Sequence, residues 1–177
     1  EVKDNKLIKQ FLNKNHIQGF LGSKVKLGLF YEKELVSIMT FGNLRKNLGQ
    51  KSKKGNYELL RFCNKKYHTV VGGASKLFKY FTKKYKPHYV LSYADKRWSD
   101  GNLYHKLGFE YVHTSSPNYF YIIGNKREGR FKYRKDILVK EGFDPNMTEI
   151  SIQHSRGYYR IFDEGSMKFE IEFKQNH

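Results

Sequence analysis

A strand, a glycine turn and an amphipathic helix follow one another directly near the middle of this chain, and this unit constrains the fold more than any other feature. The strand is the apolar run Tyr57–Cys63, and the turn contains Gly72 and Gly73. Between residues 74 and 81, apolar side chains recur at positions i, i+3, i+4 and i+7, which is the spacing of a helix face. Pro87 ends this helix, because proline cannot continue a helical hydrogen-bond ladder. The unit therefore predicts a strand that leads through a tight turn into a helix.

Segments with helix or strand periodicity flank this unit on both sides. In chain order they predict a helix that Asp4 caps, a hairpin of residues 25–31 with 35–41, a strand at 88–93, a short helix at 100–107, a hairpin of 109–114 with 118–123, a weak helix at 147–154, and a closing hairpin of 158–163 with 167–173. This order is typical of an α+β fold with a mixed, twisted sheet flanked by helices. A chain of 177 residues has the size of one domain. We therefore expect residues 1–124 to form the core and residues 125–177 to form a basic C-terminal extension packed on the same domain.

The charge of the chain is strongly positive. It has 34 Lys and Arg against 17 Asp and Glu, a formal net charge of +17. A basic excess of this size favours nucleic acid as the partner. The residues that we expect to contact it are Arg45, Lys51, Lys53, Lys54, Arg97, Trp98, Arg130, Lys132, Arg134 and Lys135. The basic residues can equally be ordinary solvated surface, and Trp98 can equally be a core residue.

Cys63 is the single cysteine, which excludes an internal disulfide and a CxxC-type zinc site, and we expect no bound metal. Its place in an apolar run is typical of a buried thiol in a reducing compartment. No apolar stretch approaches the roughly 18 residues of a membrane-spanning helix, so we expect no membrane partner.

The order of the elements resembles the fold of the GNAT acetyltransferases, the acyl-CoA N-acyltransferases, and the glycine turn supports this resemblance. In that family a central strand leads into a loop of the form Arg/Gln-x-x-Gly-x-Gly/Ala, whose backbone N–H groups hold the pyrophosphate of acetyl-CoA. This chain matches that form at Gly72 and Ala74 and departs from it at Thr69. The resemblance implies acetyl-CoA or a similar acyl donor as the cofactor, held by Val71, Gly72, Gly73, Ala74, Ser75 and Asn102. The turn can equally be a tight connection without a ligand, although N–H groups at a helix N-terminus favour an anion in any family.

A second segment, Asn102–Phe109, resembles the Asn-Leu-Tyr-x-x-x-Gly-Phe sequence of the same family. There the tyrosine protonates the departing CoA thiolate, so the resemblance makes Tyr104 the general acid. A phenol with a pKa of about 10 can donate a proton at neutral pH while its ring packs. The alternative is that Tyr104 only completes an apolar helix face with Leu103 and Leu107. Glu58 lies on the central strand, where several relatives carry a general base, but a glutamate on a strand more often faces solvent.

Several segments resemble a narrower group, a GNAT-like domain of phage proteins. They are Asn15–Gly19, Glu58–Cys63, Gly72–Leu77 and Ser92–Ser99, and Gly157–Asp163 extends the similarity over nearly the whole chain. That domain follows very-short-patch-repair-like nuclease domains in homing-type endonucleases, and it is distantly related to Mom-type DNA modification proteins. The resemblance implies DNA as the partner, an N-terminal nuclease domain outside this chain, and the cytoplasm of a phage-infected host cell. The chain itself shows no metal framework of cysteine and histidine and no carboxylate cluster of a nuclease.

By resemblance to the Mom-like proteins, four polar residues surround a cleft: His16, Asp95, Ser99 and Tyr104. Histidine titrates near neutral pH and also binds metals, so His16 could act as a base, as a ligand or only as a helix cap. Asp95 lies two residues before Arg97 and could simply form a salt bridge within a turn.

These observations support functions of two different classes. In the first, the chain is the DNA-directing module of a homing-type endonuclease, which keeps a GNAT scaffold for its shape and charge. In the second, it is a Mom-like transferase that places an acyl or aminoacyl group on a DNA base. A small-molecule acetyltransferase is disfavoured by the charge. We expect the DNA-directing module, because a loop that holds phosphate can serve DNA as well as CoA, and because Thr69 replaces the usual Arg or Gln.

Overall fold

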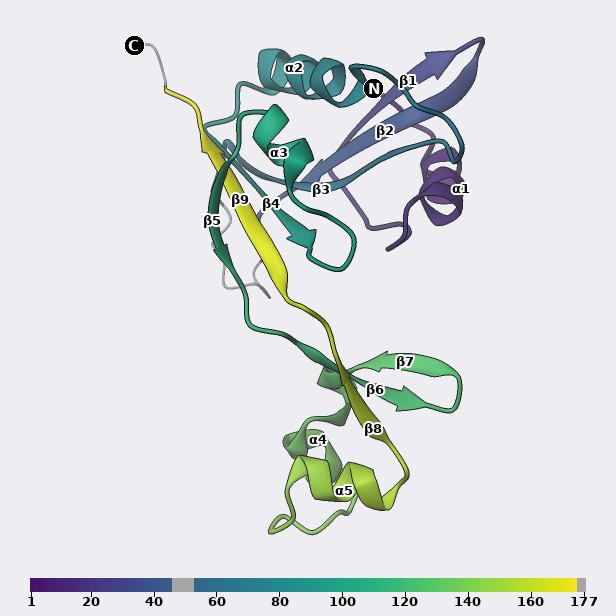
Figure 1. Ribbon diagram of the computed structural model, residues 1–177, viewed down its shortest axis with the longest axis vertical. Coiled ribbons are helices and arrows are strands. Elements are labelled where there is room, and N and C mark those ends of the chain that lie inside the picture. The colour runs from purple at the N-terminus through teal and green to yellow at the C-terminus, as the bar shows by residue number, and fades with distance from the viewer. Residues whose placement is uncertain (46–52, 175–177) are drawn as a thin grey trace. The chain divides into compact units, whose positions relative to one another are not determined.

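The computed structural model describes residues 1–45 and 53–174 and divides the chain into two compact units (Figure 1). Unit 1 contains the described residues up to 94, residues 98–114 and the described residues from 167 onward. Unit 2 contains residues 95–97 and 115–166. The boundary expected at residue 124 thus falls inside unit 2, and the last strand of the chain belongs mainly to unit 1.

Unit 1 is built on a six-stranded sheet with the order β1-β2-β3-β4-β9-β5. Its elements are α1 (Asn5–Asn15), β1 (Val25–Tyr31), β2 (Glu34–Gly42), β3 (Asn56–Asn64), α2 (Gly73–Tyr85), β4 (Tyr89–Asp95), α3 (Asn102–Lys106), β5 (Glu110–Thr114) and β9 (Ser166–Glu172). Strand β2 is antiparallel to β1 and β3, β3 is parallel to β4, and β5 is antiparallel to β9. The predicted α+β fold with a mixed sheet is confirmed.

The helices α1 and α2 cover opposite faces of this sheet (Figure 1). On one face, Ile38 of β2 packs with Ile8 and Leu12 of α1. On the other face, Phe41 of β2 stacks on Phe81 of α2 with a ring-centroid distance of 3.6 Å. Successive side chains of a strand point to opposite faces. Strand β2 is therefore apolar almost throughout, because both of its faces are buried.

Strands β3 and β4 pair along only part of their length. Their ladder ends at Leu59 and Ser92, although β3 continues to Asn64. In the ladder with β2, the register shifts at the same place, so Leu60 is an extra residue, a β-bulge. Beyond Leu59 and Ser92, the backbone N–H and C=O groups of β3 and β4 therefore form no hydrogen bonds between these two strands, although they lie in the middle of the sheet.

Unit 2 contains a three-stranded antiparallel sheet with the order β7-β6-β8. Its elements are β6 (Tyr119–Ile123), β7 (Lys126–Gly129), the 3-10 helix η2 (Arg130–Tyr133), α4 (Lys135–Lys140), α5 (Glu149–Ser155) and β8 (Tyr159–Phe162). The hydroxyls of Tyr119 and Tyr121 donate to one carboxylate oxygen of Glu149 at 2.8 and 2.7 Å. Arg160 donates to the same oxygen at 2.9 Å, so this one oxygen of the half-buried carboxylate holds β6, β8 and α5 together.

The predicted helices are confirmed as α1, α2 and α3, and the weak helix signal corresponds to α5. Asp4 caps α1 as predicted, because its Oδ1 accepts from the N–H groups of Lys6 and Leu7 at 2.8 and 3.1 Å. Among the helices described, none is long and apolar enough to cross a membrane.

Two predicted hairpins are wrong in their pairing, although their strands exist. Strand β5 pairs with β9 rather than with β6, and β8 pairs with β6 rather than with β9. The reason is that unit 2 is inserted into the β5–β9 hairpin. The chain leaves this hairpin at Ser115 and returns at Ser166, where the N–H of Ser115 donates to the Ser166 carbonyl at 2.9 Å. Local periodicity identifies a strand but does not identify its partner.

Candidate active site

Ser92 and Tyr104 meet at the point where β3 and β4 part. The Ser92 hydroxyl donates to the Leu59 carbonyl at 2.8 Å and lies 3.1 Å from the Tyr104 hydroxyl. Ser92 is 1% exposed and Tyr104 is 8% exposed, so the pair is shielded from bulk water. A serine hydroxyl has one proton, so Ser92 can turn from Leu59 to Tyr104 when negative charge develops on the phenol oxygen. Ser92 was not predicted from the sequence, where its only signal is a polar residue in an otherwise apolar strand.

Tyr104 is both a packing residue and a protonated phenol. Its ring stacks on Phe169 with a centroid distance of 4.7 Å and meets the edge of Phe109 at 5.7 Å. Burial raises the pKa of Tyr104, while the hydrogen bond from Ser92 and the charge of Arg61 oppose this rise. The phenol therefore keeps its proton at neutral pH, which is the state a general acid needs. The two sequence interpretations of Tyr104 do not exclude each other.

Gly101 places the helix that carries Tyr104. Its φ is +82°, and a Cβ at this position would lie 2.4 Å from Cζ of Phe169. Only glycine allows this close approach between the start of α3 and β9. Ser99 supports the same turn, because its Oγ accepts from the Gly101 N–H at 3.2 Å. In the described residues, Ser99 therefore acts on the turn and makes no hydrogen bond with Tyr104.

The glycine turn leads into α2 as the sequence predicts. Gly72 has a φ of +68°, and no side chain caps the helix. The N–H of Gly73 donates to the Val70 carbonyl at 3.0 Å. In the part of the chain described, no hydrogen bond uses the N–H groups of Ala74 and Ser75, as expected in the first turn of a helix. Unpaired N–H groups at the positive end of a 13-residue helix favour an anion such as a pyrophosphate.

The space around the turn fits a group that approaches the backbone closely. A Cβ at Gly72 would meet no atom within 4 Å, whereas a Cβ at Gly73 would lie 2.9 Å from Cγ1 of Val70. Val71 is 92% exposed in the same turn. Asn102 begins α3, where its own N–H donates to Oδ1 of Asp100 at 2.9 Å. The N-terminus of α2 is therefore open toward solvent and suited to hold the phosphates of a CoA-type donor.

A charged pair lies at the beginning of the β3 bulge. Glu58 is 1% exposed, and Nε of Arg45 lies 2.9 and 3.0 Å from its two carboxylate oxygens. The sequence interpretation of Glu58 as a solvent-facing glutamate is wrong, because the carboxylate is buried against Arg45. Arg45 was predicted to contact nucleic acid, but in this structure its guanidinium is engaged by Glu58.

His16 and Arg61 form the neighbouring part of the same region. Nδ1 of His16 accepts from the N–H of Gln18 at 3.1 Å, so His16 ends α1 as a cap residue. Burial, with a further contribution from the charge of Arg61, lowers the pKa of His16 to about 4. Arg61 donates to the carbonyl of Gly19 at 3.0 Å and to that of Leu60 at 2.8 Å. The sequence analysis did not single out Arg61, because an arginine in an apolar strand is not distinctive without its contacts.

Asp95 is held by an ion pair within its own turn. Its Oδ1 accepts from Nε of Arg97 at 2.9 Å, and the hydrogen bond from Arg97 is the main cause that lowers the pKa of Asp95. The simple turn interpretation of Asp95 is the one that the geometry supports, and Arg97 is partnered rather than free. Trp98 is 64% exposed and is not a core residue.

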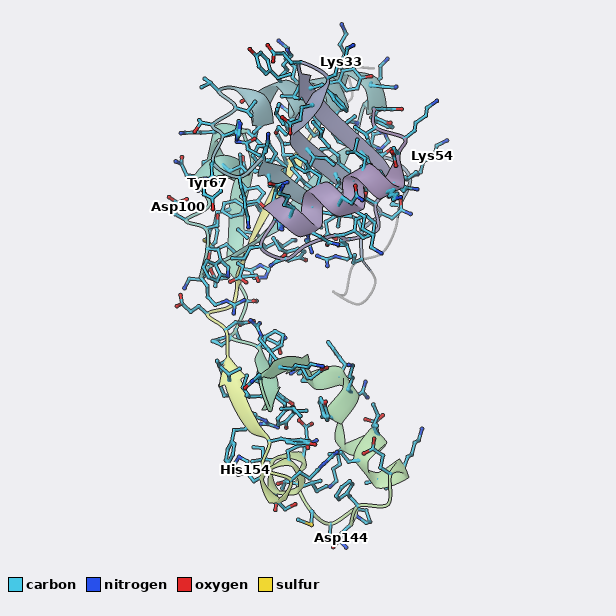
Figure 2. The ribbon with its side chains drawn as sticks, turned by 90° about the vertical axis from the view of Figure 1, so that its right-hand side faces the viewer. Lys33, Lys54, Tyr67, Asp100, Asp144 and His154 are labelled. Carbon is cyan, nitrogen blue, oxygen red and sulfur yellow. The ribbon has the colours of Figure 1, made fainter. Side chains whose placement is uncertain are left out.

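Many of the basic residues expected on nucleic acid have acidic or aromatic partners within unit 2. Lys132 bonds Glu128 at 2.7 Å, and Arg134 lies 3.1 Å from Asp136. Arg130 lies over the ring of Tyr119 at 5.2 Å. Three further members of this set, Lys53, Lys54 and Lys135, are exposed, and Figure 2 labels Lys54. Lys51 lies outside the described residues.

A hollow of about 290 Å³ opens beside the Leu60 bulge. It is lined by Leu21, Gly22, Ser23, Lys24, Gly42, Asn43, Arg45 and Leu60. Leu60 directly follows Leu59, whose carbonyl accepts the hydrogen bond from Ser92. Within residues 1–45 and 53–174, no group of histidine, cysteine, aspartate and glutamate is arranged to hold a metal ion.

Comparison with known proteins shows the fold through solved structures. No protein-family model matches the chain, and no curated protein matches it. The ribosomal-protein-S18-alanine N-acetyltransferase from Escherichia coli is similar with a TM-score of 0.60 and 9% identity, over 100% of this chain and 92% of that one. A putative acetyltransferase from Salmonella typhimurium, solved with its cofactor acetyl-CoA, has a TM-score of 0.49 and 13% identity, over 86% and 66% of the two chains. A Bacillus subtilis acetyltransferase in complex with CoA has a TM-score of 0.48 and 10% identity, over 97% and 85%.

These comparisons correct the function expected from the sequence. The structure with a TM-score of 0.60 is an N-acetyltransferase that matches this chain along its whole length, and it is not a DNA-directing module of an endonuclease, so that interpretation is wrong. The charge and the departure at Thr69 had favoured it, but neither feature reports on the fold. The strand order, the parting of β3 and β4 and the full-length likeness to the Escherichia coli enzyme show that this chain has the fold of the GNAT acyl-CoA N-acetyltransferases.

Proposed function

We propose that the protein is an N-acyltransferase that moves an acyl group from a CoA thioester to an amine. The observation that carries this proposal is the buried pair of Ser92 and Tyr104 at the parting of β3 and β4. The open N-terminus of α2 supports it, because its free N–H groups suit the pyrophosphate of the donor. The donor would supply the activated acyl group as a thioester.

Tyr104 would supply the proton that the departing thiolate needs. Its raised pKa keeps the phenol protonated until the thiolate, a stronger base than a thioester sulfur, appears beside it. Ser92 can then donate to the phenolate oxygen, which lies 3.1 Å away, and stabilise its charge. Water is excluded from this pair by the rings of Phe109 and Phe169.

The acceptor amine would enter through the hollow beside Leu60. It must lose a proton when it becomes an amide, and two groups near this region can accept one. Glu58 is the buried carboxylate, and Arg45 must move for it to act. His16 is unprotonated at neutral pH, but its low pKa of about 4 makes it a weak base. Glu58 is the candidate base that directly precedes Leu59, the residue whose carbonyl accepts from Ser92.

Calorimetry with acetyl-CoA and turnover with an amine panel test this function. We expect wild-type protein to bind acetyl-CoA, Gly73→Val to lose that binding, and Tyr104→Phe to keep it while turnover falls about 100-fold or more. Tyr31→Phe is the matched control, because Tyr31 is 67% exposed and ends β1, an edge strand of the sheet. Absence of acetyl-CoA binding by the wild-type protein, or full turnover by Tyr104→Phe, would contradict the proposal.

A second candidate is that the acceptor amine belongs to a DNA base, as in the Mom-like proteins. The net charge of +17 supports a polyanionic acceptor, and unit 1 carries most of this excess. Each phosphate that the protein neutralises would contribute about −0.9 to the slope of log K against log salt. We expect duplex DNA binding to weaken steeply between low and physiological salt, measured by fluorescence anisotropy. An affinity that does not change with salt would remove DNA as the acceptor.

A further inference from the structure

Arg61 carries a half-buried positive charge that forms no ion pair with any residue the structure describes. Its Nε donates to the Gly19 carbonyl and its Nη1 to the Leu60 carbonyl, at 3.0 and 2.8 Å, and both acceptors are neutral. Among the ion pairs of the described residues, none includes Arg61. A buried charge without an opposite charge is unfavourable. An anion bound next to Arg61 on the central strand would therefore be electrostatically favourable.

The groups around Arg61 cannot supply that anion. Both oxygens of Glu58, the nearby carboxylate, are already held by Arg45. His16 is neutral at physiological pH, because burial and the charge of Arg61 lower its pKa to about 4. Burial and the charge of Arg45 also lower the pKa of Arg61 itself. The local balance of fixed charge is thus positive.

The hollow beside Leu60 is lined by Arg45, whose charge acts on Arg61. Arg61 donates to the carbonyl of Gly19, and residues 21–24, which follow Gly19 in the chain, line the hollow. Lys24 and Arg45 are its charged lining residues, and both are positive. The Oγ of Ser23 also lines it and is buried with no hydrogen-bond partner in the described part of the chain. A cationic wall with an unused hydroxyl suits a ligand that has acceptor oxygens.

We propose that the acceptor substrate carries an anionic group, a carboxylate or a phosphate, close to its amine, and that Arg61 binds this group beside the Leu60 bulge. This inference rests on the proposed acyl transfer, and it names the class of acceptor. A guanidinium bonded through Nε and Nη1 still has donors on Nη2 for an oxyanion. Binding of the anion there would orient the amine toward Ser92 and Tyr104, so Arg61 is a positioning residue that selects the substrate.

Equilibrium binding of small amines, without donor and without turnover, tests this inference. The probes form two matched pairs: β-alanine with 3-aminopropanamide for a carboxylate, and phosphoethanolamine with ethanolamine for a phosphate. We expect wild-type protein to bind at least one anionic probe about tenfold more tightly than its neutral partner. Arg61→Gln should remove this preference, and Arg61→Lys, which keeps the charge, should retain part of it. Arg156→Gln is the control, because Arg156 is a half-buried arginine of unit 2 that pairs with Glu141 of the same unit.

The outcomes separate this inference from the proposed function. Equal affinity of wild-type protein for both members of each pair, or an unchanged preference in Arg61→Gln, would overturn the inference. If Arg61→Gln does not fold, as judged by circular dichroism, the wild-type preference and its reduction in Arg61→Lys decide instead. Acetyl-CoA binding is measured separately, so transfer to amines without anion preference would leave the function standing and reject the anion site. The pair that shows the preference identifies the anion as carboxylate or phosphate.

Discussion

At the scale of single residues, burial decides the protonation state of the groups around the candidate site. Tyr104 is kept protonated, and His16 is kept neutral. The hydrogen bond from Gln18 explains why His16 is neutral in structural terms, since a protonated imidazole has no lone pair with which to accept it. Such a histidine makes the stability of unit 1 depend on pH.

His16 should make the protein less stable in mild acid. Its pKa is about 6.5 in an unfolded chain and about 4 in the folded protein, so the unfolded chain binds more protons between these values. The free energy of unfolding should therefore fall as the pH falls from about 6.5 to about 4. Urea titrations of His16→Asn, whose amide oxygen can accept from the same N–H, should show a flatter dependence. His113→Asn, at an exposed strand position, should follow the wild type. A dependence as steep in His16→Asn as in the wild type would contradict this account.

At the scale of elements, the close contact between the start of α3 and β9 fixes the position of Tyr104. The feature that allows it is the absence of a side chain at Gly101. Any Cβ there would meet the ring of Phe169 and would also strain a left-handed backbone.

Gly101→Ala should destabilise unit 1 by about 2 kcal/mol or more. Gly22→Ala is the control, because a Cβ at Gly22 meets no atom within 4 Å and its φ is not positive. Chemical denaturation of both variants measures the difference. An unchanged free energy of unfolding for Gly101→Ala would show that α3 can shift away from β9 without cost.

Most elements of this fold and the local β1–β2 hairpin could be predicted from the sequence, but the pairing of strands that are far apart in the chain could not. Helical spacing located α2, and the Asp4 cap located α1, because both signals are local. Strand β5 pairs with β9, and the inserted unit 2 separates the two strands in the sequence. A local sequence pattern cannot identify a pairing partner that is so far away in the chain. The same limit applies to the site: the resemblance located Tyr104, whereas Ser92 and Arg61 gain their meaning only from contacts across strands.

At the scale of the whole molecule, unit 2 behaves as an insertion whose two ends lie together. Ser115 and Ser166 are joined by the backbone hydrogen bond at 2.9 Å and by a second bond from the N–H of Ser166 to Oγ of Ser115 at 3.0 Å. The next residues, Thr114 and Met167, are already paired in the β5–β9 ladder. A short turn could therefore replace the insertion without moving either strand.

Replacing residues 116–165 by Asn-Gly should leave a core that folds. Asn-Gly forms the two-residue turn that antiparallel strands prefer, and it would close the β5–β9 hairpin directly. We expect a cooperative thermal transition by circular dichroism and, where the wild-type protein binds acetyl-CoA, retained binding by calorimetry. A core without a cooperative transition would show that unit 1 depends on unit 2 for its stability.

The joined ends of unit 2 also set an order of events during folding. Strand β9 completes the sheet of unit 1 beside β4, yet it must find β5 across the whole insertion. Closing an unfolded loop of that length carries an entropic cost that grows with the logarithm of its length. Once unit 2 has folded, its ends are held side by side, and β9 reaches β5 as the second arm of a hairpin. We therefore expect the β5–β9 hairpin, and with it the sheet of unit 1, to close faster when the unit inserted between these strands has already folded.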